Sequence, residues 1–534
     1  MQGAIFTLSN KFGGLLPRPE PHMVGPNRAA ALSNANLDTG SIRAQAGPGD
    51  AVYTGGAGTY RSIYKFGGSW VTDSNTVAWQ YVEFQGRLIR AAASNSPQYL
   101  SGSSWYTLGI TAPGSAPTLG TAAGGLTGTY YYYVTYFNAA GDESAPSPIS
   151  AGVSPAGQAV ALSNIPVSAD AQVTGRRIYR TGGTLSTINL VATLNASDTT
   201  ATDNTADGAV GAALTTQTYT PPGQLEGIFV VPHMSRLMGW IGSDLYWCEV
   251  DLVAAWPAAN TQPFPDTIKG GASFSGSVVV LTTSQPIVVL GNSPAGTGFA
   301  TYAVPAQQGC LERDTVVDMG HALFYLSNDG ICAFAGRDVE VISKQALADS
   351  LLATPGAASP TNAKAVRYNE RYILFFQSGT SFSSGGYVEW NPRVDGNWLT
   401  GTITATAVHY NRTDDVLYVA QGSNVVKPYE AGTTVAGSYT TGAWVEKSFS
   451  LLKHWTQLAT DNTGTVAVSV VIDGVTVLSA ATMAGGASTV TRTRRRLPAG
   501  CRGRSISITI TWDAGWNGKL VEVLDNVARK AARL

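Results

Sequence analysis

The chain has 534 residues, too many for a single hydrophobic core, so several domains are expected. Charged residues make up 13% of it and leave a formal net charge of -1, which excludes a bulk electrostatic attraction to nucleic acid or anionic membranes. The 60 glycines, 23 tyrosines and 12 tryptophans are typical of a turn-rich all-β protein, because strands favour aromatic residues and turns need glycine.

Residues 1–50 hold little periodic pattern and are predicted to form an extended N-terminal arm. Helix is excluded around Pro17, Pro19 and Pro21, because proline lacks the backbone donor that a helix needs. Such an arm either lies across its own domain or reaches a neighbouring subunit. We expect it to matter for assembly more than for the fold of the isolated chain.

A β-propeller is predicted for residues 51–112 together with residues 222–435. Within the second range, apolar runs recur at steps of 42, 44, 50 and 43 residues. Most of them are followed by a short polar turn and a second apolar run. A hairpin repeated at this spacing is typical of propeller blades. The runs are centred on Met238, Val280, Phe324, Leu374 and Leu417.

Residues 113–221 have a different texture and are predicted to form an inserted Ig-like or fibronectin-like β-sandwich. Proline and glycine clusters bound the segment on both sides, and short strands alternate with turn residues inside it. Another blade strand lies around Ile89, which is 149 positions before Met238. Removing residues 113–220 leaves 41, close to the blade step, so the sandwich is predicted to lie between two blades.

Residues 436–534 are predicted to form a C-terminal sandwich-like β-domain. Apolar and polar residues alternate over Thr465–Ile472, and Asp473-Gly474 is a strong hairpin signal. A short terminal helix is predicted within Leu520–Leu534, and two helical turns within Lys344–Leu352.

The cysteines, the N-terminus and the apolar segments of the sequence do not indicate a secreted or membrane-spanning protein. The cysteines are far apart and form no CxxC pair, so buried thiols are expected. The N-terminus lacks the pattern of a signal peptide, and no 18-residue apolar segment spans a membrane. We therefore expect assembly in a reducing cytoplasm. The four cysteines are Cys248, Cys310, Cys332 and Cys501.

No sequence pattern indicates a catalytic site, a metal or a cofactor. The histidines lack metal-ligand spacing, and no phosphate-binding loop or GxSxG elbow occurs. Asp198, Asp203 and Asp207 partly mimic a calcium loop, but its closing glutamate is missing, so a structural turn is the preferred interpretation. The sequence predicts a protein that is not an enzyme; a propeller glycosidase, which would need two facing carboxylates, is the less favoured alternative.

Two features of the sequence each allow more than one functional interpretation. The aromatic run Tyr130–Phe137 fits a sugar-stacking platform, although strand alternation favours a core position for half of it. The second feature is an arginine cluster, which could contact phosphates, contact an acidic patch of a neighbour, or protect a solvated strand edge. Its members are Arg492, Arg494, Arg495 and Arg496, followed by Arg502 and Arg504.

The arm runs through a Phe-Gly-Gly element, a Pro-Arg step, an alanine-rich segment and an Asn, Leu, Gly and Arg series. In this order it resembles the opening of tail nozzle (hub) proteins of short-tailed bacteriophages. Tyr133–Tyr136, Gly141–Ser144 and Arg177–Arg180 resemble the fibronectin-like module of such proteins, and Gly386–Pro392 with Asn397-Trp398 resembles one of their blades. The alanine-rich segment of the match is Ala29 to Ala31. The other matching residues are the candidates for assembly contacts: Phe12, Gly13, Gly14, Pro17, Arg18, Asn34, Leu37, Gly40 and Arg43.

The resemblance implies a structural virion protein that forms a homo-hexameric ring below the portal and the tail adaptor, or head-to-tail connector. Such a nozzle retains the genome and then passes it during ejection, so the implied partners are further copies of the chain, adaptor, portal, tail fibres or spikes, and transiently the genomic DNA. The implied location is the phage tail, after assembly in the bacterial cytoplasm. The alternative from a different class is a receptor-binding or carbohydrate-binding tail component.

Overall fold

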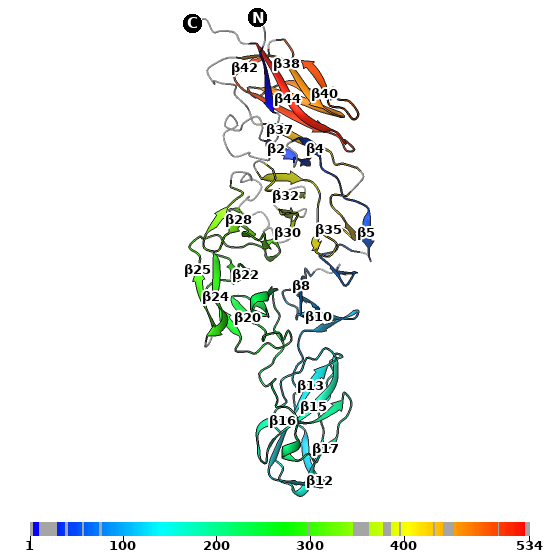
Figure 1. The fold of residues 1–534 in the computed structure, drawn as a ribbon, viewed down its shortest axis with the longest axis vertical. Helices are drawn as coiled ribbons and strands as arrows, with labels where there is room; N and C mark the ends of the chain where they lie inside the picture. Colours follow the sequence, from blue (N-terminus) through cyan, green and yellow to red (C-terminus); the bar gives the residue numbers. More distant parts are fainter. Residues whose placement is uncertain are drawn as a thin grey trace. The chain divides into compact units, whose positions relative to one another are not determined.

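The computed structural model describes residues 4–9, 29–37, 41–55, 58–73, 77–295, 298–344, 363–376, 386–394, 397–430, 433–441, 453–499 and 501–528. These residues form β-strands and three short 3-10 helices, and no α-helix occurs among them, so the prediction of an all-β protein is confirmed (Figure 1). The chain divides into two compact units. One comprises Met1–Ala78, Leu281–Pro286 and Ala303–Leu534, and the other comprises Trp79–Val280 and Ile287–Tyr302.

Three four-stranded antiparallel sheets fall mainly in the second unit, each in meander order. In this unit β18 packs beside both β8 and β22, so the first strands of the sheets lie side by side as the inner strands of propeller blades do. The 3-10 helix η3 (Pro232–Met234) joins β18 to β19. The strands are β8 (Gln80–Phe84), β9 (Arg87–Ala91), β10 (Gln98–Ser101) and β11 (Ser104–Thr107); β18 (Gly227–Val231), β19 (Arg236–Ile241), β20 (Asp244–Trp247) and β21 (Thr261–Pro263); and β22 (Ile268–Phe274), β23 (Ser277–Thr282), β24 (Pro286–Ala295) and β25 (Gly298–Ala303).

Three more four-stranded sheets belong to the first unit, where β30 packs beside β26 and β34. The last sheet takes its fourth strand, β5, from the N-terminal part of the chain, and the hairpin β6–β7 lies against β34. The strands are β26 (Val317–Asp318), β27 (Leu323–Ser327), β28 (Gly330–Phe334) and β29 (Val339–Val341); β30 (Lys364–Tyr368), β31 (Arg371–Phe376), β32 (Gly386–Trp390) and β33 (Trp398–Gly401); β34 (Ala407–Asn411), β35 (Val416–Gln421), β36 (Asn424–Val426) and β5 (Ala51–Thr54); and β6 (Ser62–Phe66) with β7 (Ser69–Asp73). The 3-10 helix η4 (Arg313–Thr315) precedes β26.

The predicted blade period is confirmed, because each apolar run is the second strand of a four-stranded sheet: β19, β23, β27, β31 and β35. These second strands are flanked on both sides, which explains their near-continuous burial and hence their apolar sequences. The predicted strand around Ile89 is β9, again a second strand. Closure of all six sheets into one ring stays a prediction.

Between β11 and β18 the chain forms two three-stranded antiparallel sheets that enclose one apolar core. Alternate residues Tyr130, Tyr132 and Val134 enter this core, as the period of a strand requires. We call residues 113–221 the insert. One sheet contains β12 (Thr118–Thr127), β14 (Ala156–Ser163) and β17 (Ala201–Asp203); the other contains β13 (Tyr130–Asn138), β15 (Val173–Gly182) and β16 (Leu185–Asn195). The 3-10 helix η2 (Asp207–Ala209) follows β17.

The C-terminal residues form two further sheets, which include strands of the N-terminal arm; we call them the C-terminal sandwich. The predicted hairpin is confirmed, with Asp473 and Gly474 at φ of 46° and 81°, both of the sign that a type I′ turn needs. One sheet has the order β2 (Ala29–Ser33), β37 (Gly437–Thr441), β43 (Ile506–Trp512), β39 (Thr465–Ile472) and β40 (Val475–Ala484). The other has the order β3 (Ala35–Asn36), β4 (Ile42–Ala44), β44 (Lys519–Ala528), β38 (Lys453–Asn462) and β41 (Thr491–Arg496), with β1 (Ala4–Ser9) on β44 and β42 (Arg502–Gly503) on β38.

The predicted terminal helix is wrong for residues 520–528, because Lys519–Ala528 forms strand β44. This strand pairs with β38 along one edge and with β4 and β1 along the other. Its sequence carries valines at 521, 523 and 527, and β-branched residues favour strands. Pairing on both edges outweighs the weak local preference for helix. Residues 529–534, and residues 345–362 with most of the other predicted helix, lie outside the described residues.

From residue 29 onward, the arm packs against its own chain as part of the C-terminal sandwich. Ala29, Leu32, Leu37 and Ile42 are buried in the core of the C-terminal sandwich. The expectation that residues before 44 matter more for assembly than for the fold stays a prediction. For residues 29–44 the structure adds a role in the fold, because removing them would expose that core and leave the edges of β37 and β44 unpaired.

Asn34 is the polar centre of this stretch and is only 2% exposed. Its Nδ2 donates to Thr402 Oγ1 at 3.0 Å and to the Ala436 carbonyl at 2.7 Å, while its Oδ1 accepts from the Thr402 amide at 2.8 Å. Its own amide donates to the Thr400 carbonyl, and its carbonyl accepts from the Gln45 amide. Its φ is 54°, in the left-handed region that asparagine tolerates better than most residues.

We predict that Asn34→Ala lowers the free energy of unfolding by about 2–4 kcal/mol, because buried partners lose their hydrogen bonds and alanine is strained at positive φ. Urea unfolding of the full chain measures this. Arg43→Ala, at an exposed position of the same stretch, is the control and should change the value by less than about 0.5 kcal/mol. Equal effects of the two substitutions would contradict the role given to Asn34.

Candidate functional site

The predicted assembly residues of the arm divide into three groups. Asn34 and Leu37 are enclosed by their own chain, which gives them a structural role, whereas Arg43 is exposed on β4. Their part in assembly stays a prediction. The others lie outside the described residues: Phe12, Gly13, Gly14, Pro17, Arg18 and Gly40.

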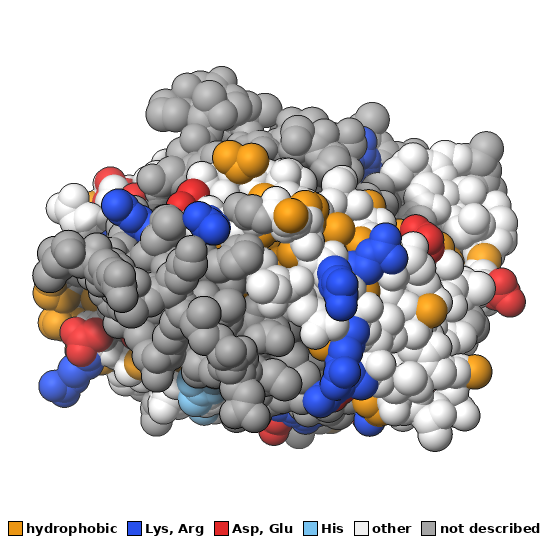
Figure 2. Space-filling model, turned by 90° about the horizontal axis from the view of Figure 1, so that it is seen from above, with side chains coloured by type: hydrophobic (Ala, Val, Ile, Leu, Met, Phe, Trp, Pro, Cys, Tyr) orange, Lys and Arg blue, Asp and Glu red, His pale blue; other side chains and the backbone are white. Residues whose placement is uncertain are grey.

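The arginine cluster lies mostly on β41, the edge strand of its sheet, which pairs with β38 alone. All four of its arginines are exposed. Figure 2, which looks onto the C-terminal sandwich, shows several Lys and Arg side chains gathered along one stretch of this face. The predicted strand and its exposed edge are therefore both present. The arginines are Arg492, Arg494, Arg495 and Arg496.

Only the first of these arginines has an acidic partner on its own chain within the described residues. Arg492 donates through Nε and Nη2 to the two carboxylate oxygens of Asp461 on β38, at 2.7 and 2.6 Å. In the same described part of the chain, no carboxylate lies within ion-pair distance of the three that follow it on β41. These three charges are thus available to a partner.

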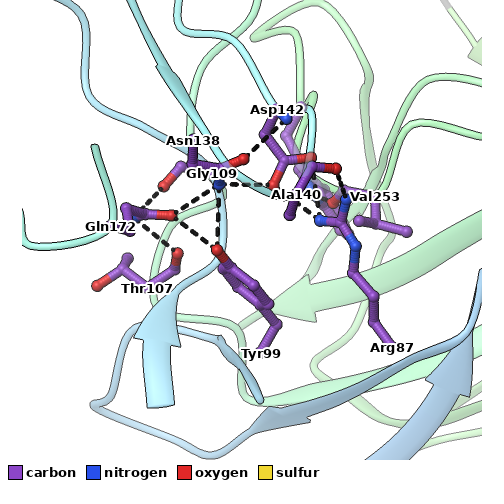
Figure 3. Close-up of polar contacts among 10 residues, drawn as sticks. Arg87, Tyr99, Thr107, Gly109, Asn138, Ala140, Asp142, Gln172 and Val253 are labelled. Atoms are coloured by element: carbon purple, nitrogen blue, oxygen red, sulfur yellow. Dashed lines mark hydrogen bonds and ion pairs between the residues drawn. The ribbon is translucent and has the colours of Figure 1, made fainter. Parts of the chain in front are cut away.

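A buried polar network joins the insert to the sheet β8–β11 (Figure 3). Arg87 on β9 donates to both carboxylate oxygens of Asp142, at 3.0 and 2.7 Å, and to the Ala140 carbonyl at 2.8 Å. The two side chains of this ion pair are 20% and 10% exposed, so the contact is shielded from solvent on most sides. Nη1 makes both contacts with the carboxylate and Nη2 makes the contact with the carbonyl, so the guanidinium is held at two of its nitrogens. Charge-assisted hydrogen bonds of this kind are stronger than neutral ones.

Beside this ion pair lies a cluster of three buried side chains, Tyr99, Asn138 and Gln172, which are 3%, 4% and 5% exposed. The Tyr99 hydroxyl donates to Gln172 Oε1 at 3.2 Å, and Asn138 Nδ2 donates to that hydroxyl at 3.1 Å. Gln172 Nε2 donates to the carbonyls of Thr107 and Gly109, at the end of β11 and just after it. Burial raises the pKa of Tyr99 to about 12, so the hydroxyl remains a donor at physiological pH. The insert is therefore held to its sheet by satisfied polar contacts.

Two sequence motifs of the insert turn out to be structural. Glu143 of the Gly-Asp-Glu-Ser stretch accepts from the Tyr179 hydroxyl at 2.8 Å and pairs with Arg177. Arg180 is completely buried and donates to Asp203 at 2.6 Å and to Asp207 at 2.8 Å. Two aspartates of the calcium-like stretch therefore bind an arginine, which supports their interpretation as structural turn residues.

A serine every third residue closes the outer edge of β13. Each serine accepts a hydrogen bond on Oγ from an amide of β13 and donates its own amide to the same residue's carbonyl. This pairing covers an edge that would otherwise be open to another strand. The even Ser-Ala-Pro-Ser-Pro-Ile-Ser spacing is the signal in the sequence from which the closed edge could have been predicted. The pairs are Ser144 with Tyr136, Ser147 with Val134, and Ser150 with Tyr132.

The aromatic run on β13 divides as strand alternation requires. Tyr130, Tyr132 and Tyr136 are buried, whereas Tyr131 is 36% exposed. Tyr133 is half-buried on the same face as Tyr131. A continuous sugar-stacking platform is thus not formed by this strand alone.

The Gly386–Pro392 stretch is likewise structural, as the third strand of its sheet and the turn after it. Glu389 is buried and pairs with Arg371, with Nη1 and Oε1 3.3 Å apart. Asn391 Nδ2 donates to the same carboxylate at 3.0 Å, and the Asn391 amide donates to the Asn397 carbonyl. Burying a carboxylate here is tolerated because it is both paired and hydrogen-bonded.

No group of three or more potential metal ligands occurs among the described residues. The four cysteines are all described and buried, and none forms a disulfide, as the sequence predicted. Asp329, in the Asn-Asp-Gly turn between β27 and β28, accepts a hydrogen bond from Gln308 Nε2. Over the same described stretches, no helix is long and apolar enough to cross a membrane.

Comparison with known proteins gives likenesses of fold alone. No protein-family model matches the chain, and no curated protein matches it. Among solved structures, PorZ, a bacterial surface component of the type IX secretion system of Porphyromonas gingivalis, is 8% identical, with a TM-score of 0.31 over 76% of this chain and 44% of its own. The WD40 β-propeller domain of Doa1 is 11% identical, with a TM-score of 0.23, and the CNH domain of AfRom2 is 10% identical, with a TM-score of 0.24. Each of these two alignments covers 51% of this chain and 88% of the other. The chain spans less than half the length of PorZ, and likenesses at these TM-scores carry no argument about function.

We predict that Gln172→Leu loosens the insert from its sheet, because the Thr107 and Gly109 carbonyls, Tyr99 and Asn138 all lose a buried partner. Hydrogen exchange of residues 105–112 should become faster, and stability should fall by about 1–3 kcal/mol. Gln158→Leu, at an exposed position on β14, is the matched control and should leave both unchanged. Unchanged exchange in Gln172→Leu would show that the network does not hold the insert.

A second prediction concerns His409, whose ring lies 4.3 Å from that of Tyr64 and whose buried Nε2 has no hydrogen-bond partner among the described residues. Burial, with the charge of Lys65, lowers the pKa of His409 from 6.5 to about 4. The folded state therefore binds fewer protons than the unfolded state between these values. The contribution of neutral His409 to the free energy of unfolding should be fully present above about pH 6.5, and it should be lost as the pH drops toward 4.

His409→Phe keeps the ring contact and removes the titration. The difference in urea midpoint between the variant and the natural chain should therefore grow in favour of the variant from pH 7 to pH 4.5. Comparing the two chains cancels the titration of the carboxylates they share. A difference that does not change with pH would refute the assignment.

Proposed function

We propose that this chain is a structural subunit of the tail nozzle of a short-tailed bacteriophage. It would form a ring of identical copies, six by family resemblance, below the portal and the tail adaptor. It would retain the genome and then pass it during ejection, with tail fibres or spikes as further partners. The proposed location is the virion tail.

The observation that carries the proposal is the N-terminal segment. Its motif, from Phe12 to Arg43, resembles the opening of nozzle proteins. The same segment continues into strands that complete the C-terminal sandwich and, through β5, the last four-stranded sheet. A subunit that bears load benefits from such pairing between distant parts of the chain, because no part can separate without breaking several strand pairs at once.

The charge of the chain agrees with a conduit for DNA. Each phosphate that a protein neutralises adds salt-dependent affinity, so a channel that must release its cargo should carry few free cations. The chain has 34 Lys and Arg against 35 Asp and Glu. Many of these charges are consumed in internal pairs such as Arg180 with Asp203 and Arg371 with Glu389.

We predict that the purified chain forms rings, alone or when the cognate adaptor is added, visible by negative-stain electron microscopy and by mass photometry. Phe12→Asp with Arg18→Glu should abolish ring formation and leave the melting temperature within about 1 °C. A chain that stays monomeric with adaptor and portal present would overturn the proposal. Loss of melting temperature in parallel with assembly would show that these residues serve the fold.

The alternative is a receptor-binding or carbohydrate-binding tail component, which the firmly held insert favours. Exposed Tyr131 and half-buried Tyr133 offer two aromatic rings on one face of β13. Against this function, Tyr130 and Tyr132 lie in the core of the insert, and Tyr136 is buried as well. Glycan binding that is lost on deleting residues 113–221, with particle assembly intact, would favour this alternative over the nozzle.

A further inference from the structure

The open edge of β41 differs from the other edges of the C-terminal sandwich in its charge. Thr491 Oγ1 accepts from the amide of Gly486 in the preceding loop, and Thr493 Oγ1 donates to the carbonyl of Ala484, the last residue of β40. Beyond them the edge consists of Arg494, Arg495 and Arg496, all exposed. No second strand of the described residues pairs with this edge.

The register places the arginines on both sides of the edge. Arg494 lies opposite Ala459 of β38, and Arg495 lies opposite Leu458, which is fully buried. Because successive side chains point to opposite faces, Arg494 and Arg496 flank the edge on the outer face and Arg495 flanks it on the core side. Guanidinium groups thus border the row of backbone donors and acceptors on two sides.

We propose that β41 is a docking edge for an acidic, extended protein segment, which adds to the sheet as a further strand. Backbone groups of the segment would pair with the free edge, and its Asp or Glu side chains would pair with Arg494, Arg495 and Arg496. This inference is independent of the nozzle proposal, because it concerns one edge of the isolated chain.

The edge fits a peptide better than it fits nucleic acid. A free strand edge presents N–H and C=O groups in alternation, and a second peptide strand offers the complementary groups. A phosphate backbone has no donors for the exposed carbonyls. Arg492 of the same strand binds Asp461 of β38 through Nε and Nη2, which is the fork geometry with which an arginine binds a carboxylate.

Protection against aggregation alone does not account for the composition of the edge. Edge strands are commonly protected by lysine, whose flexible ammonium stays hydrated. Here all four charges on a six-residue strand are arginine, whose planar group loses less freedom when it binds a carboxylate. The choice of arginine is the signature of recognition.

The test uses the full chain and a fluorescein-labelled peptide of alternating glutamate and threonine, with oligothymidylate of equal charge as the nucleic-acid probe. Fluorescence anisotropy should show salt-sensitive binding of the peptide in preference to the oligonucleotide. Arg494→Glu with Arg496→Glu should weaken peptide binding at least about tenfold. The matched control, Arg337→Glu with Arg412→Glu, reverses two arginines that lie elsewhere in the chain and should bind normally.

Hydrogen exchange separates strand addition from a loose charge contact. On binding the peptide, exchange of residues 491–497 should become slower, because added backbone pairing protects the edge. Arg494→Lys with Arg496→Lys should bind several-fold more weakly at unchanged net charge. The proposal would be overturned if the control variant lost peptide binding equally, or if oligothymidylate bound more tightly than the peptide. It would also be overturned if the edge amides stayed unprotected, or if the natural chain self-associated through this edge without binding the peptide.

Discussion

The fold depends on the pairing of strands from the first part of the chain with strands from its last part. β2 pairs with β37, β4 and β1 pair with β44, and β5 pairs with β36. Each of these pairs closes an edge that would otherwise expose unpaired backbone groups. Because the partners are hundreds of residues apart, the C-terminal sandwich and the last four-stranded sheet are complete only when the whole chain is available. Such long-range pairing folds slowly and leaves edges open for longer, so a charged edge such as β41 is useful during folding as well.

The insert is attached by a different kind of interaction. Its own core is apolar, but its contact with the sheet β8–β11 includes the partly buried pair Arg87 and Asp142 and the buried polar residues Asn138, Gln172 and Tyr99. Apolar contacts tolerate small rotations, whereas a satisfied buried network has one arrangement and a high cost for leaving it. The serine pairing along β13 gives the insert a closed edge. Together these features give the insert a fixed orientation on its sheet and a strand edge that does not recruit another chain.

The small number of charges makes their placement informative. Arg180, Arg371 and Arg87 all lie in internal ion pairs, where they satisfy buried carboxylates. Arg494, Arg495 and Arg496 stand out because the same residue type is gathered, exposed and unmatched within the described residues on one edge. In a chain that otherwise pairs many of its arginines, this clustering is the observation that motivates the proposed docking edge.

The sequence by itself determined the features that depend on neighbouring residues. Period-two alternation identified β39, Asp473-Gly474 identified its turn, and the spacing from Met238 to Leu417 identified the second strands of five sheets, because pleat, turn and burial act within a few residues. Tertiary structure decided the rest. Leu520–Ala528 became a strand because β38, β4 and β1 pair with it, and Asn34 became a structural centre because Thr402, 368 positions away, lies beside it. Partners so distant leave no local sequence pattern, because folding alone brings together the groups that hydrogen-bond to each other.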